Sequence, residues 1–427
     1  MCNLNRRLLL FIALCLILVV AASLAVLYEN GFLTGSNEPE PSVLWQSDME
    51  RFATDFVVAE GKVFTSDAQG DVHCFDAQSG ESLWDADVGG YTGARSTIAV
   101  YDGKLYVGCR GSVVNRLDMN TGKIELSYQA PVWTSGGSKG APSNFFVADG
   151  KMFAAQDGIA VYNESNGELL WKTDMMGVLE TANISAPESD YIFIRGHSRL
   201  NPNNGSAIWH VSGGSSGATS VTQGKVLFWN YNPVGGSDDG RILLCVNAFS
   251  GEEEWSFDVG SRMFQPIVSN GMVLFGAEDG YLYSVDFADG TLNWRTFAYD
   301  QNTTEADVLD VTAFSVQADS QHQRVFWSVT VSYNETKADN GTILSLDLSD
   351  GNRIWTCPVT NETSWNFVGA TLSNNILYVT ANYNLYCLDA NNGTLKLKQN
   401  FEHYVLPSVV TDNKVFVAAD LWLIAYE

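Results

Sequence analysis

The stretch Ser284–Trp294 reads SVDFADGTLNW, and the spacing of its residues recurs along the chain. Asp286 lies four residues before Gly290, and Trp294 lies four residues after that Gly. Eight units share this pattern, with Asp or Asn first, Gly second and a large apolar residue third, namely Trp84, Leu126, Trp171, Trp209, Trp255, Trp294, Trp355 and Leu397. A repeat of about 40–45 residues built from short strands is typical of β-propeller blades.

Each residue type in the pattern has a physical reason to stand at a corner between two strands. The Asp or Asn side chain accepts from backbone N–H groups one or two residues on, and so starts a turn. The Gly supplies the positive φ that a tight hairpin needs. The Trp buries a large area against the neighbouring blade, because a four-stranded blade cannot cover its own faces. We therefore interpret one set of residues as structural docking residues and assign none of them to catalysis: Trp45, Trp84, Trp171, Trp209, Trp255, Trp294 and Trp355.

The corner motif Asp-x-x-x-Gly-x-x-x-Trp resembles the tryptophan-docking motif of quinoprotein-type β-propellers. That family includes the pyrroloquinoline quinone (PQQ) dehydrogenases and non-enzymatic propellers such as the outer-membrane β-barrel assembly lipoprotein. The resemblance covers about residues 43–427. Two residues before the Asp or Asn, where the family often has Ala, this chain has Cys74, Cys245 and Cys387, which we expect to be buried thiols. The resemblance implies an all-β, closed propeller of four-stranded blades, and eight blades is the family norm.

The number of blades follows from the strands, which we name A to D in each unit. The first unit is expected to have A at 56–59, B at 62–66, C at 72–75 and D at 82–87. Nine B strands are expected, beginning near residues 63, 105, 152, 192, 226, 273, 325, 377 and 415. Residues 43–47 resemble a lone D strand, and residues 414–427 supply strands that lack a corner. We therefore predict nine blades, the last a composite of both ends that closes the ring.

Residues 8–28 form an uncharged apolar stretch directly after Arg6 and Arg7. The stretch is long enough to span a bilayer, so we predict an N-terminal transmembrane helix. Ser23-Leu24-Ala25 leaves a cleaved signal peptide as the alternative. The basic flank predicts an extracytoplasmic propeller, at a cell surface or in a periplasm.

The chain is therefore expected to have three parts: an anchor or signal at 1–29, a polar linker at 30–42 and the propeller at 43–427.

Composition narrows the classes of partner. The formal net charge of −25 argues against nucleic acid, which requires a basic surface.

The five His residues lie in different units without metal-ligand spacing. Asn-x-Ser/Thr sequences suggest glycosylation outside the cell and occur at Asn163, Asn183, Asn204, Asn302, Asn334, Asn340, Asn361 and Asn392.

The resemblance implies a cofactor floor, a Ca²⁺ site and a catalytic Asp in an enzyme of this family, and adjacent cysteines in its alcohol dehydrogenases. No Cys-Cys pair occurs in the chain, and no group of acidic residues maps onto such a site. We therefore predict no enzyme activity, no PQQ and no Ca²⁺. A PQQ-dependent dehydrogenase and a cell-surface glycan-binding protein are the alternatives.

The long connections predict where a binding surface lies. They fall between strands D and A or between B and C, which emerge at the same end of an up-and-down blade, whereas the A–B and C–D turns are short. Their aromatic residues are the binding-face candidates: Trp133, Tyr231, Tyr299, Tyr333 and Trp365. The prediction is a membrane-tethered, extracytoplasmic propeller that binds a protein or glycan partner without catalysis.

Overall fold

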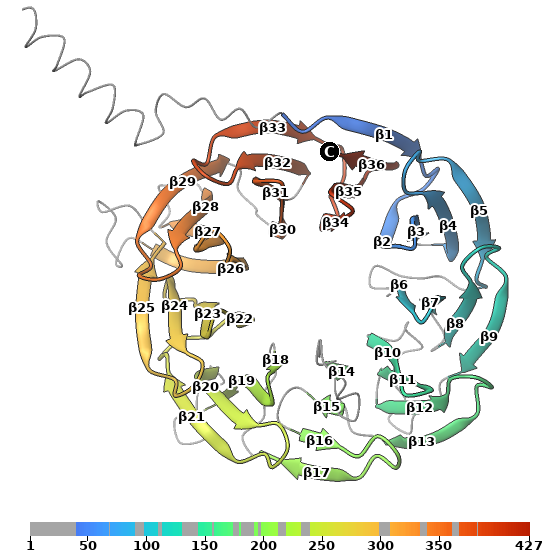
Figure 1. Cartoon of the computed structure of the whole chain (residues 1–427), viewed down its shortest axis with the longest axis horizontal. Helices are drawn as coiled ribbons and strands as arrows, with labels where there is room; N and C mark the ends of the chain where they lie inside the picture. The colour runs from blue at the N-terminus through green and yellow to red at the C-terminus, as the bar shows by residue number, and fades with distance from the viewer. Residues whose placement is uncertain are drawn as a thin grey trace, which may run out of the picture.

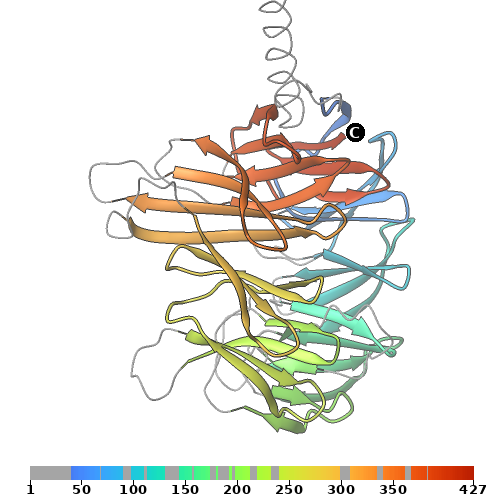
Figure 2. The ribbon, with the colours of Figure 1, turned by 60° about the vertical axis from the view of Figure 1, so that its left-hand side comes forward.

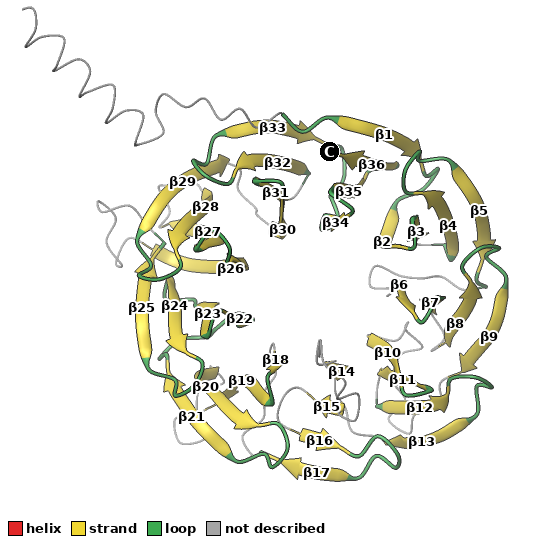
Figure 3. Cartoon of the chain, viewed as in Figure 1, coloured by secondary structure: helices red, strands yellow, loops and turns green. Residues whose placement is uncertain are grey.

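The computed structural model describes most of the chain from Glu40 onward. The described residues are 40–67, 69–89, 98–109, 113–129, 144–155, 158–173, 179–180, 192–194, 198–211, 219–231, 240–298, 308–333, 340–360, 367–381 and 383–427. They form strands and connections without a helix (Figure 3). Within these ranges no helix is long and apolar enough to cross a membrane. The predicted anchor at 8–28 lies outside them.

The described strands form nine antiparallel sheets of four strands, arranged around a central axis (Figure 1). In the first sheet, β2 (Ala53–Ala59) lies nearest the axis, followed outward by β3 (Lys62–Asp67), β4 (Asp71–Asp76) and β5 (Ser82–Asp87). Strand β2 begins three residues before the predicted strand A, because its pairing with β3 continues through an irregularity between Ala53 and Asp55. Nine sheets is the number that the count of B strands predicts.

Seven further sheets repeat this order along the chain. Their strands are β6 (Ile98–Tyr101), β7 (Lys104–Cys109), β8 (Val113–Asp118) and β9 (Ile124–Gln129); β10 (Asn144–Ala148), β11 (Lys151–Ala155), β12 (Ile159–Asn163) and β13 (Leu169–Thr173); β14 (Leu179–Glu180), β15 (Ile192–Ile194), β16 (Ser198–Leu200) and β17 (Ala207–His210); β18 (Thr219–Thr222), β19 (Lys225–Tyr231), β20 (Gly240–Asn247) and β21 (Glu253–Asp258). The next three sheets contain β22 (Ile267–Ser269), β23 (Met272–Gly276), β24 (Tyr281–Asp286) and β25 (Leu292–Phe297); β26 (Val308–Asp319), β27 (Arg324–Tyr333), β28 (Asn340–Asp347) and β29 (Arg353–Thr360); β30 (Phe367–Ser373), β31 (Ile376–Ala381), β32 (Asn384–Asp389) and β33 (Leu395–Asn400).

The ninth sheet contains both ends of the described chain. It consists of β34 (Val409–Thr411), β35 (Lys414–Ala419), β36 (Trp422–Tyr426) and, on the outside, β1 (Val43–Asp48). Strand β1 runs antiparallel to β36, with Trp45 opposite Ala425 and Asp48 opposite Trp422. Figure 2 shows β1, in blue, beside the red strands that end the chain. We call this the composite sheet.

The turn between strands C and D is built as the sequence predicts, with one difference. Asp76 Oδ1 accepts from the backbone N–H groups of Gln78 at 2.9 Å and Ser79 at 2.8 Å. These donors lie two and three residues on, whereas one or two was expected. The N–H of Ala77 is not free for this role, because it donates to the carbonyl of Gly61 in the preceding turn.

The core lies between neighbouring sheets. One cluster joins Leu274 and Leu282 of the sixth sheet to Val325 and Leu344 of the seventh, all of them fully buried. The thiols of Cys74, Cys245 and Cys387 are buried in such clusters, which confirms the expectation for them. Burial raises the pKa of Cys74 and of Cys245 to about 12, so these thiols stay protonated and unreactive.

The alternating strand direction gives each blade two ends. The A–B and C–D turns meet at one end, which we call the corner face. The B–C and D–A connections meet at the other end, which we call the loop face.

Candidate functional site

The seven docking Trp residues all bind the corner of the next sheet. Each indole Nε1–H donates to a backbone carbonyl there: Trp45 to Ala77 at 3.3 Å, Trp84 to Met119 at 3.1 Å, Trp171 to Pro202 at 2.9 Å, Trp209 to Ala248 at 3.1 Å, Trp255 to Phe287 at 3.1 Å, Trp294 to Leu348 at 3.1 Å and Trp355 to Ala390 at 3.0 Å. Because the only polar atom of each ring is bonded inside the fold, these rings have no free hydrogen-bond donor, as expected of structural residues.

The corner Gly makes this docking possible. A Cβ atom placed on Gly351 would lie 2.4 Å from Cε3 of Trp294, which is closer than two non-bonded carbon atoms approach each other. The φ of Gly351 is +72°, a conformation that other residues adopt only at a cost. The Asp, Gly and Trp of the repeat therefore act together as one joint between blades.

Leu126 replaces Trp at the junction between the second and third sheets, and polar side chains complete that junction. Arg116 forms an ion pair with Glu164 and also donates to the Glu164 carbonyl at 2.7 Å. The hydroxyl of Tyr106 donates to the Glu164 carboxylate at 2.7 Å, and that of Tyr128 to its carbonyl at 2.6 Å. Leu126 itself lies against Gly167, and Glu164, whose carbonyl stands where other corners accept an indole N–H, receives four polar contacts instead.

The five aromatic binding-face candidates are not placed by the structure. Trp133, Tyr299 and Trp365 lie outside the described residues. Tyr231 and Tyr333 end strands β19 and β27, and only their backbone is described. Their role in binding stays a prediction.

A different group of aromatic residues lies exposed on the loop face, around the composite sheet. Tyr383, in the β31–β32 connection, and Tyr404, in the β33–β34 connection, are 41% and 57% exposed, with ring centroids 4.9 Å apart. Phe52, in the β1–β2 connection, is 44% exposed, and its ring centroid lies 4.3 Å from that of His403. We call these four residues, Phe52, Tyr383, His403 and Tyr404, the aromatic patch.

The connections that carry the patch are held by backbone contacts. The N–H of His403 donates to Asp420 Oδ1 at 2.5 Å, and the N–H of Glu402 donates to Asp420 Oδ2 at 2.9 Å. The N–H of Phe401 donates to the carbonyl of Tyr383 at 2.7 Å. These bonds hold the connection that carries His403 and Tyr404, which lowers the conformational entropy lost on binding.

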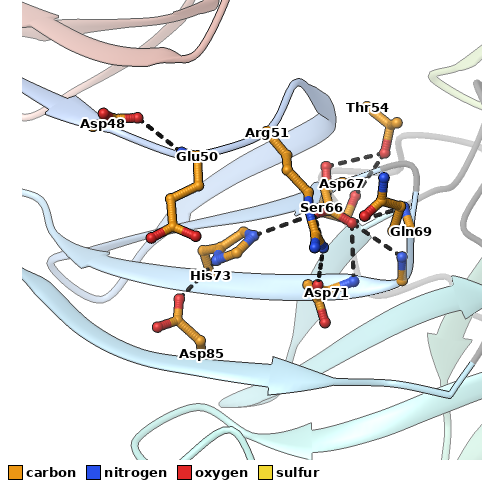
Figure 4. A network of polar contacts seen from close by, with 11 residues as sticks. Asp48, Glu50, Arg51, Thr54, Ser66, Asp67, Gln69, Asp71, His73 and Asp85 are labelled. Atoms are coloured by element: carbon orange, nitrogen blue, oxygen red, sulfur yellow. Dashed lines mark hydrogen bonds and ion pairs between the residues drawn. The ribbon is translucent and has the colours of Figure 1, made fainter.

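A cleft of about 390 Å³ lies beside the patch, between the β1–β2 connection and strands β4 and β5. We call it the acidic cleft. Its lining comprises Asp48, Met49, Glu50, Arg51, Asp71, His73, Phe75, Ser82, Asp85, Ala86 and Asp87. Figure 4 shows Glu50 and Arg51 extending from the β1–β2 connection toward His73 and Asp71 of β4.

Asp67 anchors one wall of the acidic cleft. Its Oδ1 accepts from the backbone N–H groups of Gln69 at 2.8 Å and of Asp71 at 3.0 Å. Its Oδ2 lies 3.4 Å from Nη1 of Arg51 and 3.6 Å from Nε2 of His73 (Figure 4). Burial alone would raise the pKa of Asp67, but the backbone hydrogen bonds and the charges of His73 and Arg51 outweigh it and hold this pKa below its usual range.

His73 connects this wall to the outer strand. Its Nδ1 lies 2.7 Å from Asp85 Oδ1 on β5, and its Nε2 faces Asp67. Arg51 forms a second link, an ion pair with Asp71. Carboxylates on three segments are therefore joined through one imidazole and one guanidinium, which fixes the shape of the cleft.

Loop length, on which the predicted binding residues depend, does not point to the patch or the cleft. Tyr383 and Phe52 stand in connections of only a few residues. Aromatic residues at non-repeating positions of the B–C and D–A connections, whatever their length, would have been the better signal.

The sequence predicts that the chain binds neither PQQ nor Ca²⁺. Across the described ranges, no three or more His, Cys, Asp or Glu side chains are grouped so that they could hold a metal ion. The carboxylates of the acidic cleft belong to these ranges and form no such group. The absence of PQQ and Ca²⁺ stays a prediction.

Known proteins resemble this chain in sequence. A family model described as outer membrane protein assembly factor BamB matches residues 29–186, 197–321 and 339–427. A Yersinia pestis protein of that description is 25% identical over 195 residues, which cover 43% of this chain and 45% of that protein. One from Moranella endobia (strain PCIT) is 23% identical over 287 residues, covering 59% and 69%. The chain thus spans about half the length of the Yersinia protein.

The fold is also that of solved structures with other activities. The quinohemoprotein alcohol dehydrogenase from Comamonas testosteroni has a TM-score of 0.54 over 92% of this chain and 77% of its own, at 13% identity. Identity this low shows a shared fold and says nothing of activity. The family match, in contrast, covers most of the sequence. This chain therefore belongs to the family of the outer membrane protein assembly factor BamB.

Proposed function

We propose that this chain is a non-catalytic scaffold that binds proteins at a membrane surface outside the cytoplasm. The observation that carries the proposal is the aromatic patch. Tyr383 and Tyr404 are exposed and in mutual contact. Tyr is among the residues that contribute most to binding at protein interfaces.

The contrast between aromatic residues at the two ends of the blades supports this function. The indole of Trp355 on the corner face is 8% exposed and bonded within the fold, whereas the side chains of the patch face solvent. We also propose as part of the binding surface the aromatic residues that the sequence predicts for this face: Trp133, Tyr231, Tyr299, Tyr333 and Trp365.

The names of the relatives suggest what is bound. The proteins of Yersinia pestis and Moranella endobia are described as assembly factors for outer membrane proteins. By analogy, this chain holds a partner protein while membrane proteins are assembled. Such a role needs a rigid binding surface and no chemical step.

The membrane tether is part of the proposal. Residues 8–28 serve as the anchor and residues 30–42 as the linker. The β1–β36 pairing supports a propeller of residues 43–427 that is closed by the composite sheet. Strand β1 starts at the corner face, so the anchor attaches there and the loop face points away from the membrane.

Site-specific photo-crosslinking in cells tests the proposal. A photoreactive residue replaces Tyr404 on the loop face or, as the control, Phe249 on the corner face, which is 46% exposed. We expect discrete protein adducts from position 404 and none, or different ones, from position 249. Equal labelling from both positions would contradict a binding surface on the loop face.

The rival activity has its own test. The purified protein is incubated with PQQ and Ca²⁺, and dye reduction is followed with alcohols and sugars as substrates. We expect no turnover above that of the free cofactor. Turnover with stoichiometric PQQ binding would replace the scaffold with a dehydrogenase.

A further inference from the structure

The acidic cleft carries more negative charge than its own side chains neutralise. Its lining has one guanidinium and one imidazole against five carboxylates, Asp48, Glu50, Asp71, Asp85 and Asp87. Arg51 is paired with Asp71, and His73 lies against Asp85. Among the described residues, the carboxylate of Glu50 has no ion-pair partner. A cation entering the cleft would therefore meet carboxylates that the fold itself leaves unneutralised.

Glu50 is held where such a cation would meet it. Its backbone has a φ of +57°, and its N–H donates to Asp48 Oδ1 at 2.9 Å. The side chain is exposed and points from the β1–β2 connection toward His73 (Figure 4). The connection therefore projects a carboxylate over the opening between itself and strand β4.

The aromatic patch continues directly from this connection. Phe52 follows Arg51 in the chain and contacts the ring of His403, and Tyr404 is the next residue after His403. Tyr404 in turn contacts Tyr383. Two pairs of exposed rings, linked by the adjacent residues His403 and Tyr404, thus lie between the acidic cleft and the eighth sheet.

We propose that the acidic cleft and the aromatic patch together bind one extended, basic segment of a partner protein. A Lys or Arg of that segment enters the cleft, and neighbouring residues lie along the patch. Charge complementarity selects this partner, because exposed carboxylates attract a cationic chain and aromatic faces attract a guanidinium. The inference rests on the proposed function and specifies the chemistry of its partner.

The net charge of the protein favours the same partner. At −25 the whole chain attracts basic segments over a distance and repels acidic segments and phosphates. A metal ion is the less suitable occupant, since within the described residues no three ligating side chains converge. An extended segment can contact both the cleft and the rings, whereas a small ion can contact only the cleft.

Fluorescence anisotropy with labelled synthetic peptides tests the inference on the purified protein. The probes are peptides of alternating Arg and Gly, of Lys and Gly, and of Glu and Gly. We expect the Arg peptide to bind most tightly, the Lys peptide more weakly and the Glu peptide not at all. Affinity for the Arg peptide should fall as salt is added, because exposed charges are screened.

Matched variants locate the binding. Glu50→Lys should weaken binding of the Arg peptide about fivefold or more, because it reverses the charge at the opening. Glu81→Lys is the control, since it makes the same charge change on an exposed residue of the first sheet's corner. Tyr404→Ala should also weaken binding, whereas Phe249→Ala, on the corner face, should not.

The results separate the inference from the function on which it rests. Equal losses for Glu50→Lys and Glu81→Lys would mean that only the overall charge matters, and would overturn the site. No binding of the Arg peptide, with adducts still formed from position 404, would overturn the basic partner and leave the scaffold standing. If the Arg peptide does not bind and position 404 forms no adducts, the proposed function is overturned as well.

Discussion

The corner face and the region around the composite sheet's loop face use aromatic residues in opposite ways. On the corner face, Trp294 is buried and its N–H is bonded to Leu348 of the next sheet. On the loop face, Tyr383 and Tyr404 contact each other but remain exposed. The comparison teaches that the repeated residues of this propeller hold blades together, whereas the residues available to a partner are those that do not repeat.

Removal of strand β1 should have the largest effect on the corner joints. A chain that starts at Asp48 loses Trp45 and exposes the edge of β36 along its length. We expect a loss of stability greater than that of a single Trp truncation, together with aggregation through the exposed edge. Thermal unfolding is the measurement, and a chain that starts at Pro41 is the control. An unchanged melting temperature would contradict the role of the composite sheet.

Trp294→Ala should be the most damaging single substitution on the corner face. It removes a buried ring and leaves the corner at Gly351 unfilled, so we expect a loss of about 3–5 kcal/mol. Leu292→Ala, on the same strand but 47% exposed, should change stability by about 0.5 kcal/mol or less. Denaturant unfolding compares the two, and equal losses would mean that docking is unimportant.

Gly351→Ala and Gly61→Ala separate close packing from backbone conformation. Both glycines have a φ of +72°, but a Cβ on Gly61 meets nothing within 4 Å, whereas one on Gly351 meets the ring of Trp294. We expect each substitution to lower the free energy of unfolding by about 1–2 kcal/mol, because Ala is unfavourable in a left-handed backbone conformation. Gly351→Ala should lower it by about 1–3 kcal/mol more, because its methyl group meets the Trp294 ring. Similar melting temperatures for the two variants would argue against the tight joint.

Asp67→Asn should have a smaller, pH-dependent effect next to the acidic cleft. Because the pKa of Asp67 is lowered in the folded protein, its carboxylate stabilises the fold above the ordinary Asp pKa of about 3.9. That stabilisation is lost as the pH falls through the lowered pKa. The variant should therefore be less stable by about 1–2 kcal/mol at pH 7 and approach the parent in acid. A gap that stays constant from pH 7 to pH 3 would show that the charge of Asp67 is unimportant.

The fold could be predicted from the sequence because each blade repeats the same joint. Asp, Gly and Trp at fixed spacing indicate a turn, a positive φ and a buried ring. Each of these features depends on residues that lie close together in the sequence. Even the thiol of Cys245 could be placed in the core from its position in the repeat. Leu126 is visible in the sequence at a Trp position, but the contacts of Arg116 with Glu164 that complete its junction could not be predicted, because these residues lie 48 apart in the chain.

The candidate site could not be predicted for the same physical reason. Phe52 and His403 come from opposite ends of the chain, and they meet only because β1 pairs with β36. Asp67 and His73 are close in the sequence, but their link to Arg51 depends on how the first sheet packs against the composite sheet. The long connections predict a binding surface on the loop face, and that prediction does not identify these residues.

The most direct test of the account measures stability and partner binding on the same two variants. One is Trp294→Ala, and the other combines Tyr383→Ala with Tyr404→Ala. At a temperature where both are folded, the account predicts that the Trp variant has a lower melting temperature and keeps its affinity for the Arg peptide and its crosslinked partner. The double Tyr variant should keep its melting temperature and lose both. A Trp variant that loses binding while folded, or a double Tyr variant that binds as the parent does, would contradict the separation of joint and binding surface.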